Sequence, residues 1–173
     1  EMCIRDRSGS ELVARKVASL VIMAGHIENP DYVEYNVEND IPSCQEVFAK
    51  WPGEIVVTPF ELGLAAKLPA SCFKNDFGWT DHHPALDAVM AARGQYADYP
   101  TWDMTAVVYA VEGCAGYFTL SRPGTITVTD KGCTHYQADS RGRHRYMMSD
   151  HNQSALLVKH MCDLVSRKPK NKK

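Results

Sequence analysis

Two short segments carry side chains that could bind a sugar. In the first, Glu34 and Asn36 flank Tyr35 at the end of the polar stretch 25–36. If this stretch is extended, both side chains point to the same side, because successive residues of a strand alternate. A carboxylate and an amide presented together suit sugar hydroxyls, each of which donates and accepts hydrogen bonds. Acidic and amide residues are also common in solvated loops, so a purely structural interpretation stays open.

The second segment places Asp103 just before an apolar run that begins at Ala106. One interpretation is structural: Asp103 is the N-cap of a helix and accepts hydrogen bonds from free backbone amides at the positive end of the helix dipole. The other interpretation is functional. A carboxylate here could be an oxygen ligand of a hard cation such as calcium, which binds carboxylates, carbonyls and substrate hydroxyls.

The elements that would position these residues alternate between strands and helices. Apolar runs at 17–23 and 54–58 are typical of strands that are buried on both faces of a parallel sheet. Helices are expected at 11–16, 42–50 and 59–68. Ligands of open α/β sheets bind beyond the carboxyl ends of the strands, so the loop after residue 23 is the expected place for a site.

The second half of the chain adds helices and short strands. Residues 69–80 are expected to form a loop, and helices are expected at 84–93, 103–113 and 154–165. In the last helix, Leu157, Met161 and Leu164 fall on one face. Short strands are expected at 117–120, at 126–129 and near Tyr146. The pattern predicts an α/β sheet protein with a small antiparallel appendage.

Composition limits the class of protein. The chain has 173 residues, which suits one domain. A net charge of -2 gives no general attraction for nucleic acid or an anionic membrane, and no apolar run approaches the roughly 20 residues needed to cross a bilayer. The six cysteines have no metal-binding spacing. They are interpreted as reduced thiols, which favours a cytoplasmic protein, although export directed by an upstream signal stays open.

The two ends of the chain differ from its middle. Residues 1–8 have neither helix nor strand periodicity and resemble translated adaptor sequence, so they are predicted to be a non-native leader. Residues 166–173 are basic and contain nothing to bury, which predicts a disordered tail. The folded domain is therefore expected to span 9–165.

A succession of motifs in this domain resembles the inosine/uridine-preferring nucleoside hydrolases. In that family a strand ends in a Met-Gly-Gly-like turn and leads to a Glu-Phe-Asn motif and an Asp before a helix, as do Met23-Ala24-Gly25, Glu34-Tyr35-Asn36 and Asp40 here. The segment 100–107 is similar to the family's Pro-x-His-Asp-Pro-x-Ala-Val segment. The resemblance covers roughly residues 11–165, and a late hairpin at 121–132 agrees with it.

The resemblance implies a fold, a reaction and a set of site residues. The expected fold is an open, Rossmann-like, mostly parallel sheet flanked by helices, with a small antiparallel hairpin and a truncated amino terminus. Asp103 would bind calcium and ribose, Glu34, Asn36 and Asn29 would hold ribose hydroxyls, and Met23 would line the sugar pocket. The reaction would be the hydrolysis of a nucleoside to ribose and free base. A homo-oligomer is a further expectation.

Two departures from the family pattern affect the expected chemistry. The family's amino-terminal Asp cluster, which supplies most of the calcium site and the catalytic base, does not occur in this sequence, so the chain alone is expected to be inactive. Trp102 stands where many members have a His that protonates the leaving base. An indole cannot act as a general acid, although its face can stack on a nucleobase. The histidines that could replace this acid are each more typical of surface or structural positions: His26, His82, His83, His135 and His144.

Two rival functions stay open. One is a protein of the same fold that binds nucleosides or sugars without turnover, which the Trp102 departure favours. The other is an ordinary glycosidase that uses Glu34 with Asp103, whose activity would survive removal of calcium.

Overall fold

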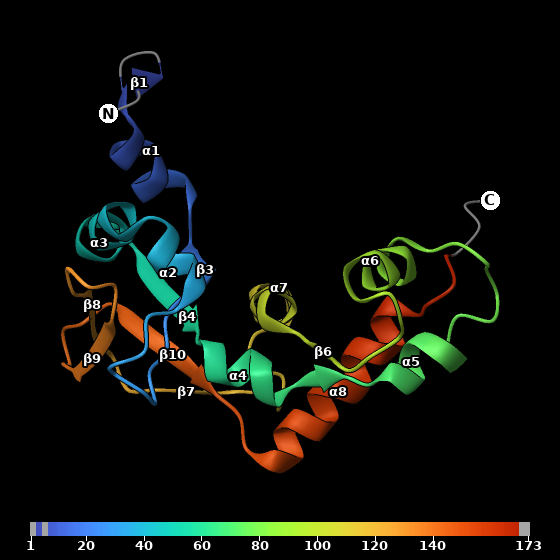
Figure 1. The fold of residues 1–173 in the computed structure, drawn as a ribbon. Helices are drawn as coiled ribbons and strands as arrows, with labels where there is room; N and C mark the ends of the chain where they lie inside the picture. Colours follow the sequence, from blue (N-terminus) through green and yellow to red (C-terminus); the bar gives the residue numbers. More distant parts are fainter. Residues whose placement is uncertain (1–2, 5–6, 170–173) are drawn as a thin grey trace.

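The computed structural model describes residues 3–4 and 7–169, so residues 1–2 and 5–6 of the predicted leader and 170–173 of the predicted tail lie outside it (Figure 1). The strands are β1 (Cys3–Ile4), β2 (Arg7–Ser8), β3 (Ser19–Met23), β4 (Glu54–Thr58), β5 (Lys67–Leu68), β6 (Tyr99–Pro100), β7 (Thr119–Leu120), β8 (Gly124–Val128), β9 (Thr134–Ala138) and β10 (His144–Met148). The helices are α1 (Gly9–Lys16), α2 (Tyr35–Asn39), α3 (Ile41–Lys50), α4 (Phe60–Ala65), α5 (Ala70–Asn75), α6 (Pro84–Arg93), α7 (Trp102–Glu112) and α8 (His151–Val165).

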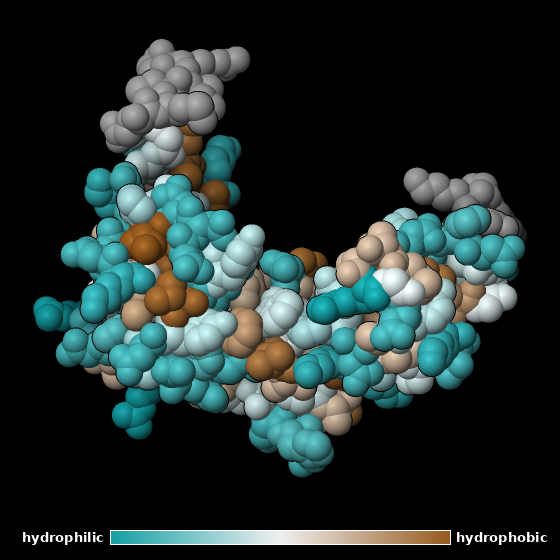
Figure 2. Space-filling view, in the orientation of Figure 1, coloured by the Kyte–Doolittle hydropathy of each residue, from teal (hydrophilic) through white to brown (hydrophobic). Residues whose placement is uncertain are grey.

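A mixed sheet organises the fold. Its strand order is β3-β4-β10-β8-β9, with β7 paired to β10. The first three strands of this order are parallel, and β8 and β9 form an antiparallel hairpin. The sheet and α1 to α3 form one arm of the molecule, α5, α6 and α8 form the other, and α7 lies between them (Figure 1). Figure 2 shows a concave side between the two arms. The predicted α/β class with a mostly parallel sheet and a small antiparallel hairpin is confirmed.

Strand β4 separates two hydrophobic cores. Its side chains alternate across the sheet, as in any strand. Ile55 and Val57 face a core with α3 and β8, whereas Val56 faces a core built from α4, α5, α7 and α8. All three are almost fully buried. The apolar run at 54–58 therefore forms the doubly buried strand that its composition predicts.

Strand β3 does not match the same prediction. It begins at Ser19 rather than at residue 17, and none of its residues is fully buried. The reason is its position at the end of the sheet order, where it pairs with β4 on one side only. An edge strand has one neighbour to cover it, so an apolar composition by itself does not make it buried.

The antiparallel region also differs from the prediction. The hairpin joins β8 to β9 and thus spans 124–138 rather than 121–132, and the strand at Thr134–Ala138 was not anticipated. The strand near Tyr146 is β10, which lies parallel to β4 near the middle of the sheet rather than in the appendage. Its residues His144, Arg145 and Tyr146 are too polar to resemble a central strand.

Several helix predictions are confirmed and others are wrong. Asp40 caps α3 by accepting the backbone N–H of Ser43, and α6 has the predicted bounds. The segment 69–80 was predicted to be a loop but contains α5, and α4 ends at Ala65, before the chain turns into β5. Leu164 of α8 is 38% exposed, so it does not share the buried face of Leu157 and Met161. No helix in the described part of the chain has the length and apolar character needed to cross a membrane.

Candidate functional site

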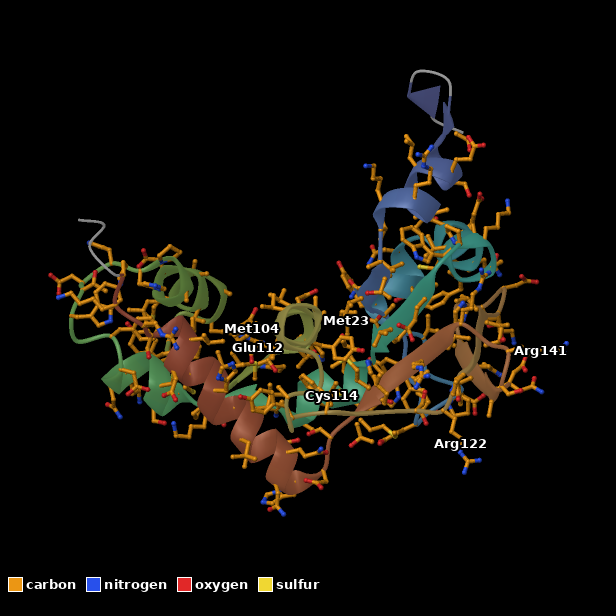
Figure 3. All side chains as sticks on the ribbon, turned by 180° about the vertical axis from the view of Figure 1, so that it is seen from behind. Met23, Met104, Glu112, Cys114, Arg122 and Arg141 are labelled. Atoms are coloured by element: carbon orange, nitrogen blue, oxygen red, sulfur yellow. The ribbon has the colours of Figure 1, made fainter. Side chains whose placement is uncertain are left out.

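A cavity of about 310 Å³ lies at the carboxyl end of β3. It brings together the end of that strand and the starts of three helices, α2, α4 and α7. Met23 at the end of β3 lies beside α7 (Figure 3). The residues that line the cavity are Met23, Glu34, Tyr35, Asn36, Phe60, Trp102 and Asp103.

Glu34 is the buried polar group of this cavity, with 2% of its surface exposed. It is the N-cap of α2, and its carboxylate accepts backbone N–H groups from Gly25, Asn36 and Val37. The condition of an extended chain at 34–36 is not met, because the cap starts a helix at Tyr35. A carboxylate has about four acceptor positions and three are used here. One acceptor position on Oε1 is left for a ligand.

Asn36 is the second residue of α2 and is hydrogen-bonded to Met23. Its Nδ2 is 2.9 Å from Met23 Sδ and 3.4 Å from the Met23 carbonyl oxygen. These contacts tie the first turn of α2 to the end of β3. The side-chain carbonyl of Asn36 has no hydrogen bond within 3–4 and 7–169, so it can accept one from a ligand hydroxyl.

Asp103 is the second residue of α7, so it is not the N-cap, which is Thr101. The hydroxyl of Thr101 instead donates to the Ala66 carbonyl, which leaves the helix without a side-chain cap. The Asp103 side chain is exposed at the cavity and has no ion pair or hydrogen bond among the residues that the structure describes. It therefore presents a free carboxylate at the positive end of the α7 dipole.

Trp102 is fixed from two sides. Its indole Nε1 donates to the Phe60 carbonyl at 3.1 Å, and its ring stacks on the Phe60 ring with centroids 5.5 Å apart. Gly63 lies directly against it, so that an added Cβ would collide with Trp102 backbone and ring atoms. Because the single N–H of the indole is already used, the side chain offers the cavity an aromatic surface and no proton.

The aromatic surface continues outward from Phe60. His26 stacks on Phe60 at 5.5 Å, and Tyr32 packs against both rings. The structure does not bring Asn29 to the cavity: Asn29 is exposed, and its side-chain oxygen accepts the N–H of Asp31. Phe60 was not predicted from the sequence as a site residue. Its place directly after β4, at the same sheet edge as the end of β3, was the signal that could have found it.

None of the five histidines proposed as leaving-group acids lines this cavity. His26 accepts the backbone N–H of Asn29 through Nδ1, which also lies 3.2 Å from a Glu61 carboxylate oxygen. His83 is the N-cap of α6, and His144 is buried in the β8–β10 region. The other two, His82 and His135, are exposed. Among the described residues that line the cavity, the Tyr35 hydroxyl is therefore the side-chain group left that could protonate a leaving base.

Comparison with known proteins identifies the fold. The solved structure of a plant nucleoside hydrolase is similar to this chain with a TM-score of 0.62 and 17% sequence identity. The likeness covers 88% of this chain but only 57% of the chain of the plant enzyme. No family profile and no curated protein sequence matches the chain. The chain thus has the fold of a nucleoside hydrolase, and the low identity limits that conclusion to the fold.

Proposed function

We propose that the cavity binds the ribose of a nucleoside and that the protein hydrolyses N-glycosidic bonds, as the inosine/uridine-preferring nucleoside hydrolases do. The observation that carries the proposal is the convergence of Glu34, Asn36 and Asp103 on one cavity, although they come from two distant segments. The likeness of the fold to a plant nucleoside hydrolase supports it. The cavity lies beyond the carboxyl end of a parallel strand, where open α/β sheets bind ligands.

The polar groups of the cavity match the hydroxyls of a sugar. Glu34 Oε1 and the Asp103 carboxylate accept hydrogen bonds, and Asn36 can accept one through its side-chain oxygen. Trp102 and Phe60 supply an apolar wall on which a nucleobase can stack. A volume of about 310 Å³ is at the lower end of the range for small-molecule sites. These features favour a ligand with a hydroxylated part and a flat apolar part.

The Asp103 carboxylate also suits the chemistry of glycosidic hydrolysis. The transition state of this reaction carries positive charge on the sugar ring, which a nearby carboxylate stabilises. Since no histidine lines the cavity within the described residues and Tyr35 carries only a weakly acidic hydroxyl, departure of the base is expected to depend mainly on the intrinsic stability of the leaving group. Nucleosides whose bases leave readily are therefore the proposed substrates.

Calcium dependence is a further part of the proposal, and the residues of this chain do not by themselves fit a calcium site. Calcium takes six to eight oxygen ligands. Asp103 provides a free carboxylate, whereas Glu34 is bound by three backbone amides. No group of three His, Cys, Asp or Glu residues within 3–4 and 7–169 is arranged to hold a metal ion. The remaining ligands would have to be water, substrate hydroxyls, backbone carbonyls or groups from another polypeptide, and we derive no chemical step through the ion.

A non-catalytic nucleoside- or sugar-binding protein is the second candidate. The observation that favours it is Trp102, whose only N–H is bonded to Phe60 and cannot protonate a base. The glycosidase alternative is less well supported, because every hydrogen-bond partner of the Glu34 carboxylate is a donor. The general acid of a glycosidase is a protonated carboxyl group that donates its proton to the leaving-group oxygen.

Calorimetric titration of the full chain with inosine, uridine and ribose tests the binding proposal. Asp103→Asn and Asn36→Ala are each expected to weaken binding by roughly tenfold. Matched controls are Asp87→Asn, in the first turn of α6, and Asn39→Ala, in the same short helix as Asn36. Equal weakening by the controls, or no saturable binding by the unaltered chain, contradicts the proposed site.

Release of ribose separates the candidate functions. The assay measures reducing sugar formed from inosine by the full chain, with calcium or with a chelator. Ribose release that requires calcium supports the hydrolase. Binding without release supports the binding protein, and release that survives chelation supports an ordinary glycosidase.

A further inference from the structure

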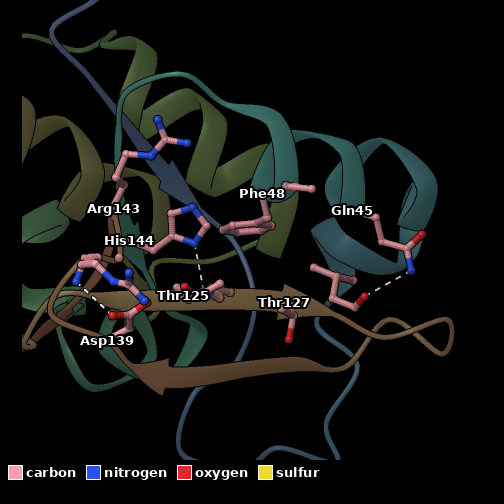
Figure 4. Close-up of a pocket in the computed structure, with 12 residues that line it drawn as sticks. Gln45, Phe48, Thr125, Thr127, Asp139, Arg143 and His144 are labelled. Carbon is pink, nitrogen blue, oxygen red and sulfur yellow. Dashed lines mark hydrogen bonds between the residues drawn. The ribbon is translucent and has the colours of Figure 1, made fainter.

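A second, larger cavity of about 570 Å³ lies between α3 and β8, closed at one end by the turn at 139–143 (Figure 4). His144, which lines it, is the first residue of β10 and pairs with Ile55 near the start of β4. The cavity proposed to bind ribose, called the sugar cavity below, lies at the opposite, carboxyl end of the parallel strands. The two cavities therefore lie at opposite ends of these strands and are separate sites.

His144 gives this cavity a buried hydrogen-bond donor. Only 6% of its surface is exposed, and its Nδ1 accepts the backbone N–H of Ile126 at 2.8 Å. Burial, helped by the charge of Arg143, lowers the pKa of the imidazole, so the ring is neutral at neutral pH. In a neutral ring whose Nδ1 accepts, the proton is on Nε2. That Nε2–H has no hydrogen-bond partner in the part of the chain that the structure describes.

Two arginines stand at the rim of the same cavity. Arg143 uses one guanidinium nitrogen to donate to the Pro52 carbonyl, which anchors the side chain and leaves its other N–H groups available. The Arg141 guanidinium has no ion pair or hydrogen bond within the described ranges. Among the described residues, Asp139 is the one acidic residue that lines the cavity, and its carboxylate accepts the backbone N–H of Arg141. The rim thus carries more positive than negative charge.

The turn that carries these residues is held in place. Gly142 lies so close to the backbone of Gly124 that a Cβ at either position would overlap neighbouring atoms. The backbone N–H of Asp139 also donates to the Pro123 carbonyl at 3.0 Å. The donors at the rim therefore project from a fixed backbone, which lowers the entropic cost of ordering them around a ligand.

We propose that this cavity binds the phosphate group of a small molecule, held by the His144 Nε2–H and by the guanidinium groups of Arg141 and Arg143. Each of these groups only donates hydrogen bonds, and two of them are charged. A phosphate has the complementary character, since its oxygens only accept and it is anionic. The volume leaves room for more than the phosphate, and Phe48 on α3 lines the cavity with an aromatic ring. The proposal does not depend on the sugar cavity.

The test is proton–nitrogen correlation NMR of the full chain during titration with inorganic phosphate at constant ionic strength. Saturable shifts of the His144 Nε2–H signal and of the β8 amides are expected. Arg141→Gln and Arg143→Gln should each weaken the binding by roughly tenfold. Arg122→Gln is the matched control, because Arg122 is exposed beside the same hairpin and lies outside the cavity. Figure 3 labels both Arg122 and Arg141, and both side chains extend away from the ribbon.

Parallel titrations with AMP and with adenosine identify the source of the phosphate. Tighter binding of AMP than of inorganic phosphate, with shifts at Phe48, supports a nucleotide ligand, and equal binding supports free phosphate. Absence of a saturable shift at His144 overturns the proposal. So does weakening by Arg122→Gln as large as that by Arg141→Gln, or binding of adenosine at this cavity as tight as that of AMP.

Discussion

The Glu34 carboxylate accepts the backbone N–H of Gly25 at 3.1 Å and thereby joins the start of α2 to the turn that follows β3. Gly25 has a φ of +75°, and the side chain of Thr134 lies where a Cβ would be. A residue with a side chain cannot replace Gly25 without strain. Helix α2 depends on the same Glu34 carboxylate for its cap. One buried side chain thus holds in place two walls of the cavity that is proposed to bind ribose.

Replacing Glu34 by Gln is expected to lower the free energy of unfolding by about 2 kcal/mol. The amide keeps one acceptor oxygen and turns an NH2 group toward backbone N–H donors. Urea unfolding followed by circular dichroism measures the change. Glu38→Gln, at an exposed position of the same helix, should change the free energy by no more than about 0.5 kcal/mol. A loss at Glu34 no larger than this would show that the carboxylate is dispensable.

Replacing Gly63 by Ala is expected to destabilise the protein although Gly63 lies in a helix. Helix propensity alone favours Ala by about 1 kcal/mol. The new Cβ would collide with Trp102, which is bonded to Phe60 and has little room to move. Overpacking of this kind costs about 1–3 kcal/mol, so thermal unfolding should begin at a lower temperature. Gly78→Ala, where a Cβ meets open space, is the control and should not lower it.

The burial of His144 predicts a pH dependence of stability. The pKa of the folded-state imidazole is lowered, so the unfolded chain binds the proton more readily as the pH falls below the ordinary value of about 6.5. The contribution to stability is complete above that value and is lost as the pH falls toward the folded-state pKa. His144→Gln should flatten the decrease in unfolding free energy between about pH 7 and pH 5. The exposed His135→Gln should keep the original slope, and identical slopes for both variants would disprove the assignment.

The outer face of α7 predicts self-association. Val107 and Val111 are 62% and 77% exposed and lie one turn apart on the helix. Val107→Ser together with Val111→Ser should reduce the mass measured by light scattering at high protein concentration, with an unfolding free energy within about 1 kcal/mol of the original. Val108→Ser, in the core on the other side, should instead destabilise the fold. Unchanged association in the double variant would exclude this face as the contact.

The parts of the fold that the sequence predicts are those where composition and burial agree. The run at 54–58 is apolar because both of its faces are buried. Asp40 and Pro42 mark the start of α3 in the sequence, as they do in the structure. β10 was not recognised as a central strand because it is rich in polar residues, each of which finds its own hydrogen-bond or ion-pair partner in the fold. His144 accepts the Ile126 N–H, and Arg145 lies 3.3 Å from Glu54. Such pairings depend on residues far away in the sequence and leave no local pattern.

The candidate site was predicted to a similar extent. Glu34, Asn36, Trp102 and Asp103 were selected from motifs, and the structure brings them to one cavity with Met23. The details were not predictable from local sequence. The Glu34 carboxylate that caps α2 also accepts the N–H of Gly25 from the turn after β3, and the Thr101 hydroxyl donates to the Ala66 carbonyl instead of capping α7. An apolar residue such as Phe60 carries no chemical signal until its neighbours are known.

The placement of β10 between β4 and β8 has a consequence for biosynthesis. Its residues leave the ribosome after those of β8 and β9, whereas β4 is translated much earlier. Until β10 arrives, the nascent chain exposes the open edge of an apolar strand, which is a template for wrong pairing. The protein therefore completes its sheet only after β10 has been translated, and holdase chaperones that shield Ile55–Val57 during that interval should raise its yield.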